Sequence, residues 1–230
     1  MDDLKSRIDY WNRLGPTKPF SHPVNLNRLA ELVDRDHRIL DVGCGYGRVM
    51  GVLHDHGYRN LVGVDPASSM IASARQRFPT LTFLEMSPTR LPFADESVDA
   101  ALLFTVLTCI PSDDEQRRVI REIDRVLRPD GLVYISDLWI QKDERNVERY
   151  RRFHGKYGVY GTFELPEGVV LRHHTRQWIE RLTTRFALIA VDEIVADTMN
   201  GHRAEAFQWF GRKAGRCDAR GRARAERRGG

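Results

Sequence analysis

Three glycines at alternate positions, preceded by an acidic residue, stand in the segment Ile39-Leu40-Asp41-Val42-Gly43-Cys44-Gly45-Tyr46-Gly47. The apolar residues before the glycines predict a buried parallel strand, and the glycines predict a loop whose backbone approaches a ligand closely. A second apolar run, 61–64, ends in Asp65. An acid at the carboxyl end of a second strand is placed to accept hydrogen bonds from a ribose diol. Together, the loop and the acid indicate a site for a nucleoside-bearing cofactor.

The spacing of the glycines separates two classes of such cofactors. Nicotinamide and flavin enzymes carry the pattern G-x-G-x-x-G, whereas this loop has G-x-G-x-G. Their third glycine stands one residue later, and Met50 and Gly51 do not supply it. Asp41, before the first glycine, would repel a pyrophosphate and suits a positively charged group. A cationic sulfonium ligand with an amino acid tail therefore fits this loop better than a dinucleotide.

Strand and helix patterns alternate along the chain around these residues. Besides the two strands above, apolar runs predict the strands 81–84, 98–104 and 132–135, the last finishing at Asp137, and a final pair at 186–194 and 204–210. Helical patterns are found at 25–33, 48–56, 68–78, 113–128 and 175–183. This alternation predicts an α/β fold with a doubly wound, Rossmann-like parallel sheet and helices on both of its faces.

Further motifs follow the glycine loop in a recognisable order: Val64-Asp65-Pro66, Leu91-Pro92-Phe93 and Leu127-Arg128-Pro129-Asp130-Gly131. With them, the chain resembles the class I S-adenosylmethionine-dependent methyltransferases from about Ile39 to Asp137. The resemblance implies a seven-stranded sheet, mostly parallel, whose last strand is antiparallel. It also implies S-adenosylmethionine as the methyl donor and S-adenosylhomocysteine as its product. Methyl transfer from a sulfonium needs no metal, because in-line positioning supplies much of the acceleration.

The resemblance also assigns the contacts of the cofactor. The carbonyls of Gly43 and Phe104 are the expected acceptors for its ammonium group, and Asp65 is expected to bind both ribose hydroxyls. Pro66 and Met70 are expected to enclose the adenine. The predicted cofactor residues are Asp41, Gly43, Cys44, Gly45, Gly47, Asp65, Pro66, Met70, Ser87 and Phe104.

One position departs from the family pattern. In the family, an Asp commonly stands four residues before the Leu of Leu-Pro-Phe and reaches the exocyclic amine of adenine, whereas this chain has Ser87 followed by Pro88. Proline has no backbone N–H to offer the ring. Either the serine hydroxyl makes this contact, or the loop shifts and Glu85 makes it.

Two segments outside the core are predicted to lie near the ligands. Residues 1–36 form an N-terminal helical cap that either closes the site or simply packs, and residues 138–174 form a polar, aromatic-rich insertion after the fifth strand. An insertion at the carboxyl end of a strand faces the ligand crevice, so we interpret it as a substrate lid. The predicted substrate-binding residues are Trp11, Lys18, Trp139, Tyr150 and Tyr157.

A general base is needed only if the accepting atom must lose a proton, as a hydroxyl does. His174, just before the predicted helix 175–183, is the first candidate, and His22 and Asp137 follow it. Its neighbour His173 is an alternative to His174. Surface histidines and acids beside helices are common, so each of these residues has a structural interpretation as well.

The positive charge of the chain is concentrated at its C-terminal end. Residues 212–230 hold eight basic and two acidic side chains, a balance of +6, so a total of +4 leaves residues 1–211 at −2. The composition of 212–230 predicts a disordered tail, and the lack of basic excess elsewhere argues against nucleic acid as a partner. We expect one domain at 1–211, with a cofactor-binding core at 37–137 and a C-terminal helix and hairpin at 175–211.

Other sequence properties point to a cytoplasmic protein with no membrane partner. The chain has no apolar run of about eighteen residues and no basic-then-apolar start typical of a secretory signal. Cys44, Cys109 and Cys217 are too scattered for a disulfide framework or a cysteine metal site. Both a monomer and a homodimer are compatible with the sequence.

The segment after the fourth strand, Phe104-Thr105-Val106-Leu107, bears on the substrate. It lacks the Asn/Asp-Pro-Pro-Tyr sequence of adenine and cytosine amino methyltransferases and the acids of metal-dependent catechol enzymes. With the aromatic composition of the lid, this favours methylation of an O or N atom of a small aromatic or heteroaromatic metabolite, in secondary metabolism. The alternatives are an RNA or protein methyltransferase and a non-catalytic cofactor-binding module.

Overall fold

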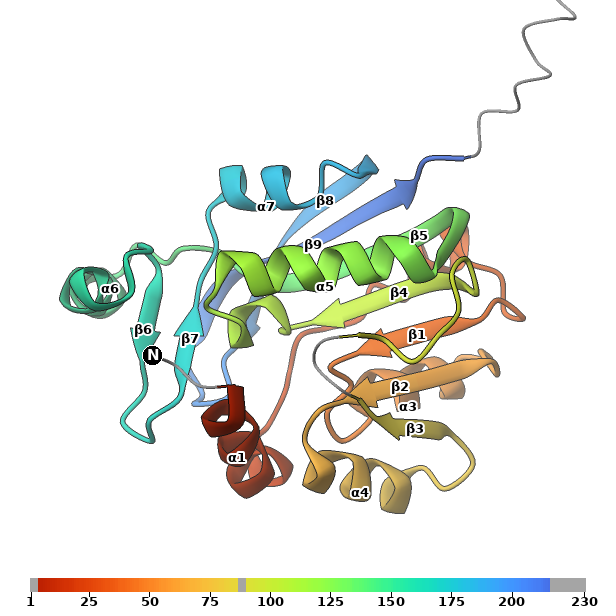
Figure 1. Ribbon diagram of the computed structural model, residues 1–230, viewed down its shortest axis with the longest axis horizontal. Helices are drawn as coiled ribbons and strands as arrows, with labels where there is room; N and C mark the ends of the chain where they lie inside the picture. Colours follow the sequence, from red (N-terminus) through yellow and green to blue (C-terminus); the bar gives the residue numbers. More distant parts are fainter. Residues whose placement is uncertain (1–3, 87–89, 216–230) are drawn as a thin grey trace, which may run out of the picture.

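A seven-stranded sheet forms the centre of the computed structural model, which describes residues 4–86 and 90–215 (Figure 1). Its strands are β1 (Ile39–Val42), β2 (Leu61–Asp65), β3 (Thr82–Glu85), β4 (Val98–Phe104), β5 (Leu127–Leu138), β8 (Phe186–Asp197) and β9 (Arg203–Lys213). The strand order is β3-β2-β1-β4-β5-β9-β8. Neighbours from β3 to β5 are parallel, whereas β9 is antiparallel to both β5 and β8. The predicted Rossmann-like sheet with an antiparallel last strand is confirmed.

Helices cover both faces of this sheet. One face carries α2 (Leu26–Leu32), α3 (Arg48–Asp55) and α4 (Ser68–Arg77), and the other carries α5 (Asp113–Val126) and α7 (Arg176–Leu182). All residues of β1 and β2 are buried between these layers, as expected for parallel strands covered on both sides. Among the described residues, no helix combines the length and the apolar character that crossing a membrane requires.

The α5–β5 junction differs from its predicted form. The predicted strand begins at 132, whereas β5 begins at Leu127, which pairs with Val98 of β4. The pairing then shifts register, so that Leu132 lies opposite Ala100. Asp130, with a φ of 64°, lets the chain make this irregular step without leaving the sheet.

The C-terminal strand also extends beyond its predicted end. Lys213 pairs with Phe186 of β8, and its Nζ donates to the carbonyl of Leu127 at 2.9 Å. Arg212 donates to the carbonyl of Asp130 at 2.7 Å. Their charge predicts that both residues belong to the tail, whereas both belong to the sheet. The remainder of the predicted tail, 216–230, lies outside the described residues.

The insertion at 138–174 has regular structure that its sequence did not reveal. It contains α6 (Glu144–Tyr157) and a hairpin of β6 (Thr162–Glu164) and β7 (Val170–Arg172). Tyr150 of α6, Phe163 of β6 and Tyr10 of α1 (Leu4–Leu14) share one apolar cluster. In Figure 1, α1, α6 and the hairpin lie on the side to which the arrowheads of the parallel strands point. Two short 3-10 turns, η1 (Gly15–Thr17) and η2 (Leu107–Cys109), complete the elements.

Candidate functional site

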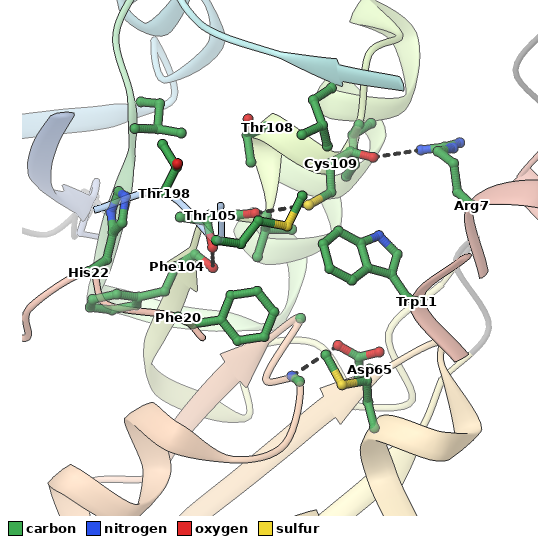
Figure 2. A pocket seen from close by; sticks show the side chains of 18 of the residues that line it. Arg7, Trp11, Phe20, His22, Asp65, Phe104, Thr105, Thr108, Cys109 and Thr198 are labelled. Carbon is green, nitrogen blue, oxygen red and sulfur yellow. Dashed lines mark hydrogen bonds between the residues drawn. The ribbon is translucent and has the colours of Figure 1, made fainter. Parts of the chain in front are cut away.

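A cavity of about 700 Å³ lies at the carboxyl ends of the parallel strands. Its wall combines the glycine loop, the ends of β2 and β4, the N-terminal segment, the insertion and the turn between β8 and β9. Figure 2 shows Trp11, Phe20 and His22 of the N-terminal segment reaching into the cavity that also holds Asp65. Enclosure by three separate segments makes this the candidate ligand site of the molecule.

Four backbone N–H groups of the glycine loop already have hydrogen-bond acceptors. Those of Gly43 and Cys44 both donate to the carbonyl of Val64, at 2.8 and 3.0 Å. The N–H of Gly45 donates to Asp65 Oδ2 at 3.0 Å, and that of Gly47 donates to Cys44 at 2.9 Å. A pyrophosphate would need such N–H groups as donors. The loop therefore offers a close backbone surface rather than an anion cradle.

Asp41 lies in the cavity wall beneath this loop and is 2 % exposed. Burial raises the pKa of its carboxyl to about 7, although the nearby Arg48 guanidinium opposes the shift. Its Oδ2 has no hydrogen-bond partner among the described residues. An unpartnered buried carboxylate oxygen costs free energy unless a cation or donor reaches it. The site thus presents an acceptor that suits a bound ammonium group.

Asp65 occupies the end of β2, as its position in sequence predicted. Its Oδ1 accepts from the N–H of Ala67 at 2.9 Å, and its Oδ2 accepts from the N–H of Gly45. Burial raises its pKa to about 6, against the effect of these two donors. Each oxygen keeps a further lone pair, so this fixed carboxylate can accept two hydroxyls side by side.

Pro66 and Met70 line the cavity beside Asp65. Met70 lies under the N-terminal segment, since a Cβ placed on Gly15 would come within 2.8 Å of its sulfur. Trp11, Phe20 and Tyr46 pack against this group. The result is a narrow apolar slot next to the carboxylate, closed by residues that precede the sheet in the chain.

Glycine is required at the three positions of the loop for different structural reasons. All have positive φ, from 54° to 83°. Gly43, Gly45 and Cys44 line the cavity, whereas Gly47 does not. A Cβ on Gly47 would lie 2.8 Å from the ring of Phe83. Gly47, predicted among the cofactor contacts, therefore serves the packing of α3 against the sheet.

Phe104 and Thr105 form the cavity wall at the end of β4. Thr105 has a φ of 56°, which is unusual for a β-branched residue. Its hydroxyl donates to the carbonyl of Phe104 at 2.7 Å, and its N–H donates to Ser136 at 2.8 Å. The Phe104 carbonyl, a predicted acceptor, thus keeps one lone pair for a ligand.

The three predicted catalytic residues occupy different places. His22 lines the cavity, with Nδ1 3.0 Å from the hydroxyl of Ser136 and Nε2 unpartnered among the described residues. Burial lowers its pKa to about 4. His174 and Asp137 do not line the cavity. They lie in the core, with 3.7 Å between His174 Nε2 and Asp137 Oδ1.

Of the predicted substrate residues, Trp11 lines the cavity and four do not. Trp139 stacks on Phe207 in the core at 3.9 Å between ring centroids. Tyr157 donates to Glu164 at 3.1 Å. Lys18 lies at the rim, where its Nζ donates to Asn200 at 2.9 Å and to Glu167 at 3.4 Å. Tyr150 lies behind the wall and contacts His173.

Ser87, the predicted adenine contact, lies outside the described residues. Its proposed substitute Glu85 is exposed and does not line the cavity, whereas the adjacent Met86 does. The N–H of Met86 donates to the carbonyl of Asp65 at 3.1 Å. The β3 end of the cavity is thereby held against the β2 end.

Sequence reasoning did not select several residues of the wall. The insertion 138–174 contributes three of them to one end of the cavity: Arg149 of α6, Phe163 of β6 and His173 after β7. The Arg149 guanidinium carbon lies 3.4 Å from the centroid of Phe163. Arg149 is one of several basic residues in a polar stretch, so the local sequence does not distinguish it from its neighbours as a cavity residue. His173 was named as an alternative to His174, without a means of choosing.

Comparisons with known proteins agree with this geometry. The family described as "Methyltransferase domain" matches residues 40–135. The chain is 33% identical over 167 residues to the O-methyltransferase rstn1 of Aspergillus nomiae, covering 66% of this chain and 71% of that protein. It is 27% identical over 109 residues to the ubiquinone/menaquinone biosynthesis C-methyltransferase UbiE of Campylobacter jejuni, covering 45% of each.

A solved structure gives the same result for the fold. A SAM-dependent methyltransferase from Methanosarcina mazei superposes with a TM-score of 0.77 at 25% identity, covering 82% of this chain and 97% of that one. The glycine loop, the acid at the end of β2, the strand order and these relatives lead to one assignment. The chain belongs to the class I S-adenosylmethionine-dependent methyltransferases.

Proposed function

We propose that this methyltransferase transfers the methyl group of S-adenosylmethionine to an O or N atom of a small aromatic or heteroaromatic metabolite, in secondary metabolism. One observation carries the proposal: a single enclosed cavity joins the glycine loop to a compartment lined by Trp11, Phe163 and Leu171. A volume of about 700 Å³ is of the size that holds a cofactor and a small molecule together. The fungal relative rstn1 is an O-methyltransferase, which supports an oxygen atom as the acceptor.

The residues present suit the cofactor. Asp41 offers its unpartnered oxygen to the ammonium group, together with the carbonyls of Gly43 and Phe104. Asp65 would bind the ribose hydroxyls, and Pro66 and Met70 would enclose the adenine. When bound, the cofactor supplies an electrophilic methyl group on a positively charged sulfur. The chain's own contribution is to orient both ligands and to exclude water.

Proton removal needs a base that faces the ligands. His22 is the predicted catalytic residue that lines the cavity. Its pKa of about 4 keeps the imidazole uncharged at pH 7, the form that a general base requires, although the same burial makes it a weaker base than a free histidine. His174 and Asp137 can act on the reaction only through other residues, because neither reaches the cavity. For an acceptor with a free nitrogen lone pair, no base is required.

The test is product formation with a labelled methyl donor. Purified protein and methyl-labelled S-adenosylmethionine are incubated with aromatic hydroxy and heteroaromatic nitrogen compounds, with RNA, and with a protein mixture. Label in a small molecule, lost in His22→Asn for hydroxyl acceptors, supports the proposal. Label only in RNA or protein would overturn the acceptor class, and cofactor binding without any transfer would indicate a binding module.

A further inference from the structure

The far end of the cavity contains a cation, Arg149, that forms no salt bridge with a described acid. The charge of Asp143, before α6, acts on it through space, but the Asp143 carboxylate is hydrogen-bonded to Asn146. The glutamates of the wall are paired elsewhere: Glu115 with Arg7 at 2.6 Å, Glu164 with Lys156 at 2.6 Å, and Glu167 with Lys18 at 3.4 Å. Arg149, which is half-buried, has no salt bridge to any described residue. Its Nε is buried without a hydrogen-bond partner among the described residues.

The guanidinium of Arg149 is also held in place. It lies over the ring of Phe163, with 3.4 Å from its central carbon to the ring centroid. Such stacking fixes the guanidinium through its face. One side of the guanidinium interacts with the Tyr150 hydroxyl, and the remaining N–H groups at its edge are left for a ligand. Arg145, one turn earlier on α6, also lines the cavity and adds positive charge. The local field therefore favours an anion.

His173 provides a second donor at the same place. The Tyr150 hydroxyl accepts from the N–H of Gln141 at 3.3 Å, and it lies 2.5 Å from His173 Nδ1. In the tautomer that the proposal uses, the phenol hydrogen is directed to Nδ1 and Nδ1 is the acceptor. A neutral imidazole with an acceptor Nδ1 carries its proton on Nε2. Nε2 has no hydrogen-bond partner among the described residues, and His173 lines the cavity.

We propose that Arg149 and the Nε2–H of His173 bind a carboxylate on the aromatic acceptor, with Tyr150 and Phe163 as the residues that position them. This inference rests on the proposed function, because it names a chemical feature of the acceptor in the same cavity. A planar carboxylate matches the fork of a guanidinium and has lone pairs left for a third donor. The contact would orient the ring, so that the accepting atom faces the cofactor end.

The experiment compares acids with their amides. The protein is first titrated with S-adenosylhomocysteine by calorimetry, and the complex is then titrated with matched pairs such as benzoate and benzamide, or 2-naphthoate and 2-naphthamide. The amides keep the shape and remove the charge. We expect at least one acid to bind about tenfold or more tightly than its amide, the range that a charge-assisted hydrogen bond gives.

Variants then locate the preference. Arg149→Gln is expected to bring the acid-to-amide ratio close to one, and Arg149→Lys to keep part of it, because Lys retains the charge without the fork. Tyr150→Phe should lower the ratio several-fold with S-adenosylhomocysteine affinity unchanged. The matched control is Arg152→Gln on the same helix, since Arg152 lies over Phe153 and does not line the cavity.

The outcomes separate this inference from the proposed function. If S-adenosylhomocysteine fails to bind, the proposed function fails. If it binds but no acid of the panel binds better than its amide, or the preference survives in Arg149→Gln, the carboxylate site is overturned while the methyltransferase assignment stands. Melting temperatures of all variants identify any that do not fold, and Arg149→Lys serves as the second test in that case.

Discussion

The two ends of the cavity are built in different ways. At the cofactor end, the wall is mainly backbone, and its charged groups Asp41 and Asp65 are fixed by adjacent strands of the sheet. At the acceptor end, the wall consists of side chains from α1, α6, the β6–β7 hairpin and the β8–β9 turn. The first design depends on the fold itself. If the proposed assignment of the two ends holds, substitutions in the second design change acceptor specificity and leave the donor site intact.

The largest effect is expected at Asp65. Asp65→Ala removes the proposed ribose acceptor and leaves the N–H groups of Gly45 and Ala67 without their partner. We expect S-adenosylhomocysteine affinity to fall about 100-fold, about 3 kcal/mol, because a charged hydrogen-bonding group is lost from a buried site. Isothermal titration calorimetry measures this directly.

The matched control for Asp65 is Glu85→Ala. Glu85 pairs with Asp65 across the β2–β3 ladder but is exposed and outside the cavity. The affinity of the Glu85→Ala variant for S-adenosylhomocysteine should stay within about twofold of the wild-type value, because surface substitutions usually have small effects. Equal losses in both variants would mean that the strand ends, rather than the Asp65 carboxylate, hold the ligand.

Two glycine substitutions, one in the glycine loop of the cofactor end and one in the insertion of the acceptor end, compare how much the local packing contributes to the free energy of unfolding. Gly47→Ala would place a Cβ 2.8 Å from Phe83 at a φ of 83°. Clash and backbone strain together should lower the free energy of unfolding by about 2 to 4 kcal/mol. Gly158→Ala, at the end of α6, has a φ of 70° but open space around it, and it should cost about 1 kcal/mol. Urea denaturation measures both, and similar losses would contradict the packing role of Gly47.

Proton release tests the role of Asp41. With a pKa of about 7, its carboxyl is largely protonated at pH 6 in the free protein. A bound ammonium group favours the charged carboxylate and lowers that pKa, so binding must release a proton near pH 6 and none near pH 9. Calorimetry in buffers of different ionisation enthalpy should detect a fraction of one proton. Asp41→Asn should lower the release and leave a smaller part from Asp65, whose pKa of about 6 also falls when hydroxyls donate to it. Unchanged release in Asp41→Asn would assign the whole proton to another group.

The smallest effect is expected from shortening the chain after Gly215. This cut keeps Arg212 and Lys213, which belong to β9. The described lining of the cavity ends in sequence at His202, so we expect cofactor affinity and transfer to small molecules to change by less than about twofold. A gel-shift assay with RNA provides the second measurement. RNA binding that persists in the shortened protein would favour a nucleic acid acceptor and would contradict the assignment of one end of the cavity to a small molecule.

Prediction from sequence succeeded where the signal is local. The strands around Asp41 and Asp65 carry apolar runs that can be buried on both sides, and the glycine loop follows directly from them. The α6 helix was missed because its residues are mainly polar and only Asn146 and Tyr150 are buried. Its partner hairpin supplies the contacts that make it a stable element, and those contacts are distant in sequence.

The neighbouring histidines show a second limit. In extended backbone, successive side chains point to opposite sides. His173 lines the cavity, whereas His174 faces Asp137 in the core and bridges Trp139. The sequence gives both the same residue type at adjacent positions, and a shift of one residue exchanges their environments. The register is held by backbone hydrogen bonds from His173 to Gly161 and from His174 to Leu138, both at 3.0 Å and both distant in sequence.

The wall of the cavity draws on residues from Leu4 to His202, nearly the full described length. A partly folded chain lacking either its first helix or its last hairpin has an incomplete pocket and can hold its ligands only weakly. Occupancy is therefore linked to cooperative unfolding of the entire chain. Protection of remote core amides from hydrogen exchange should rise with ligand concentration, which makes the saturated protein resistant to proteolysis as a unit.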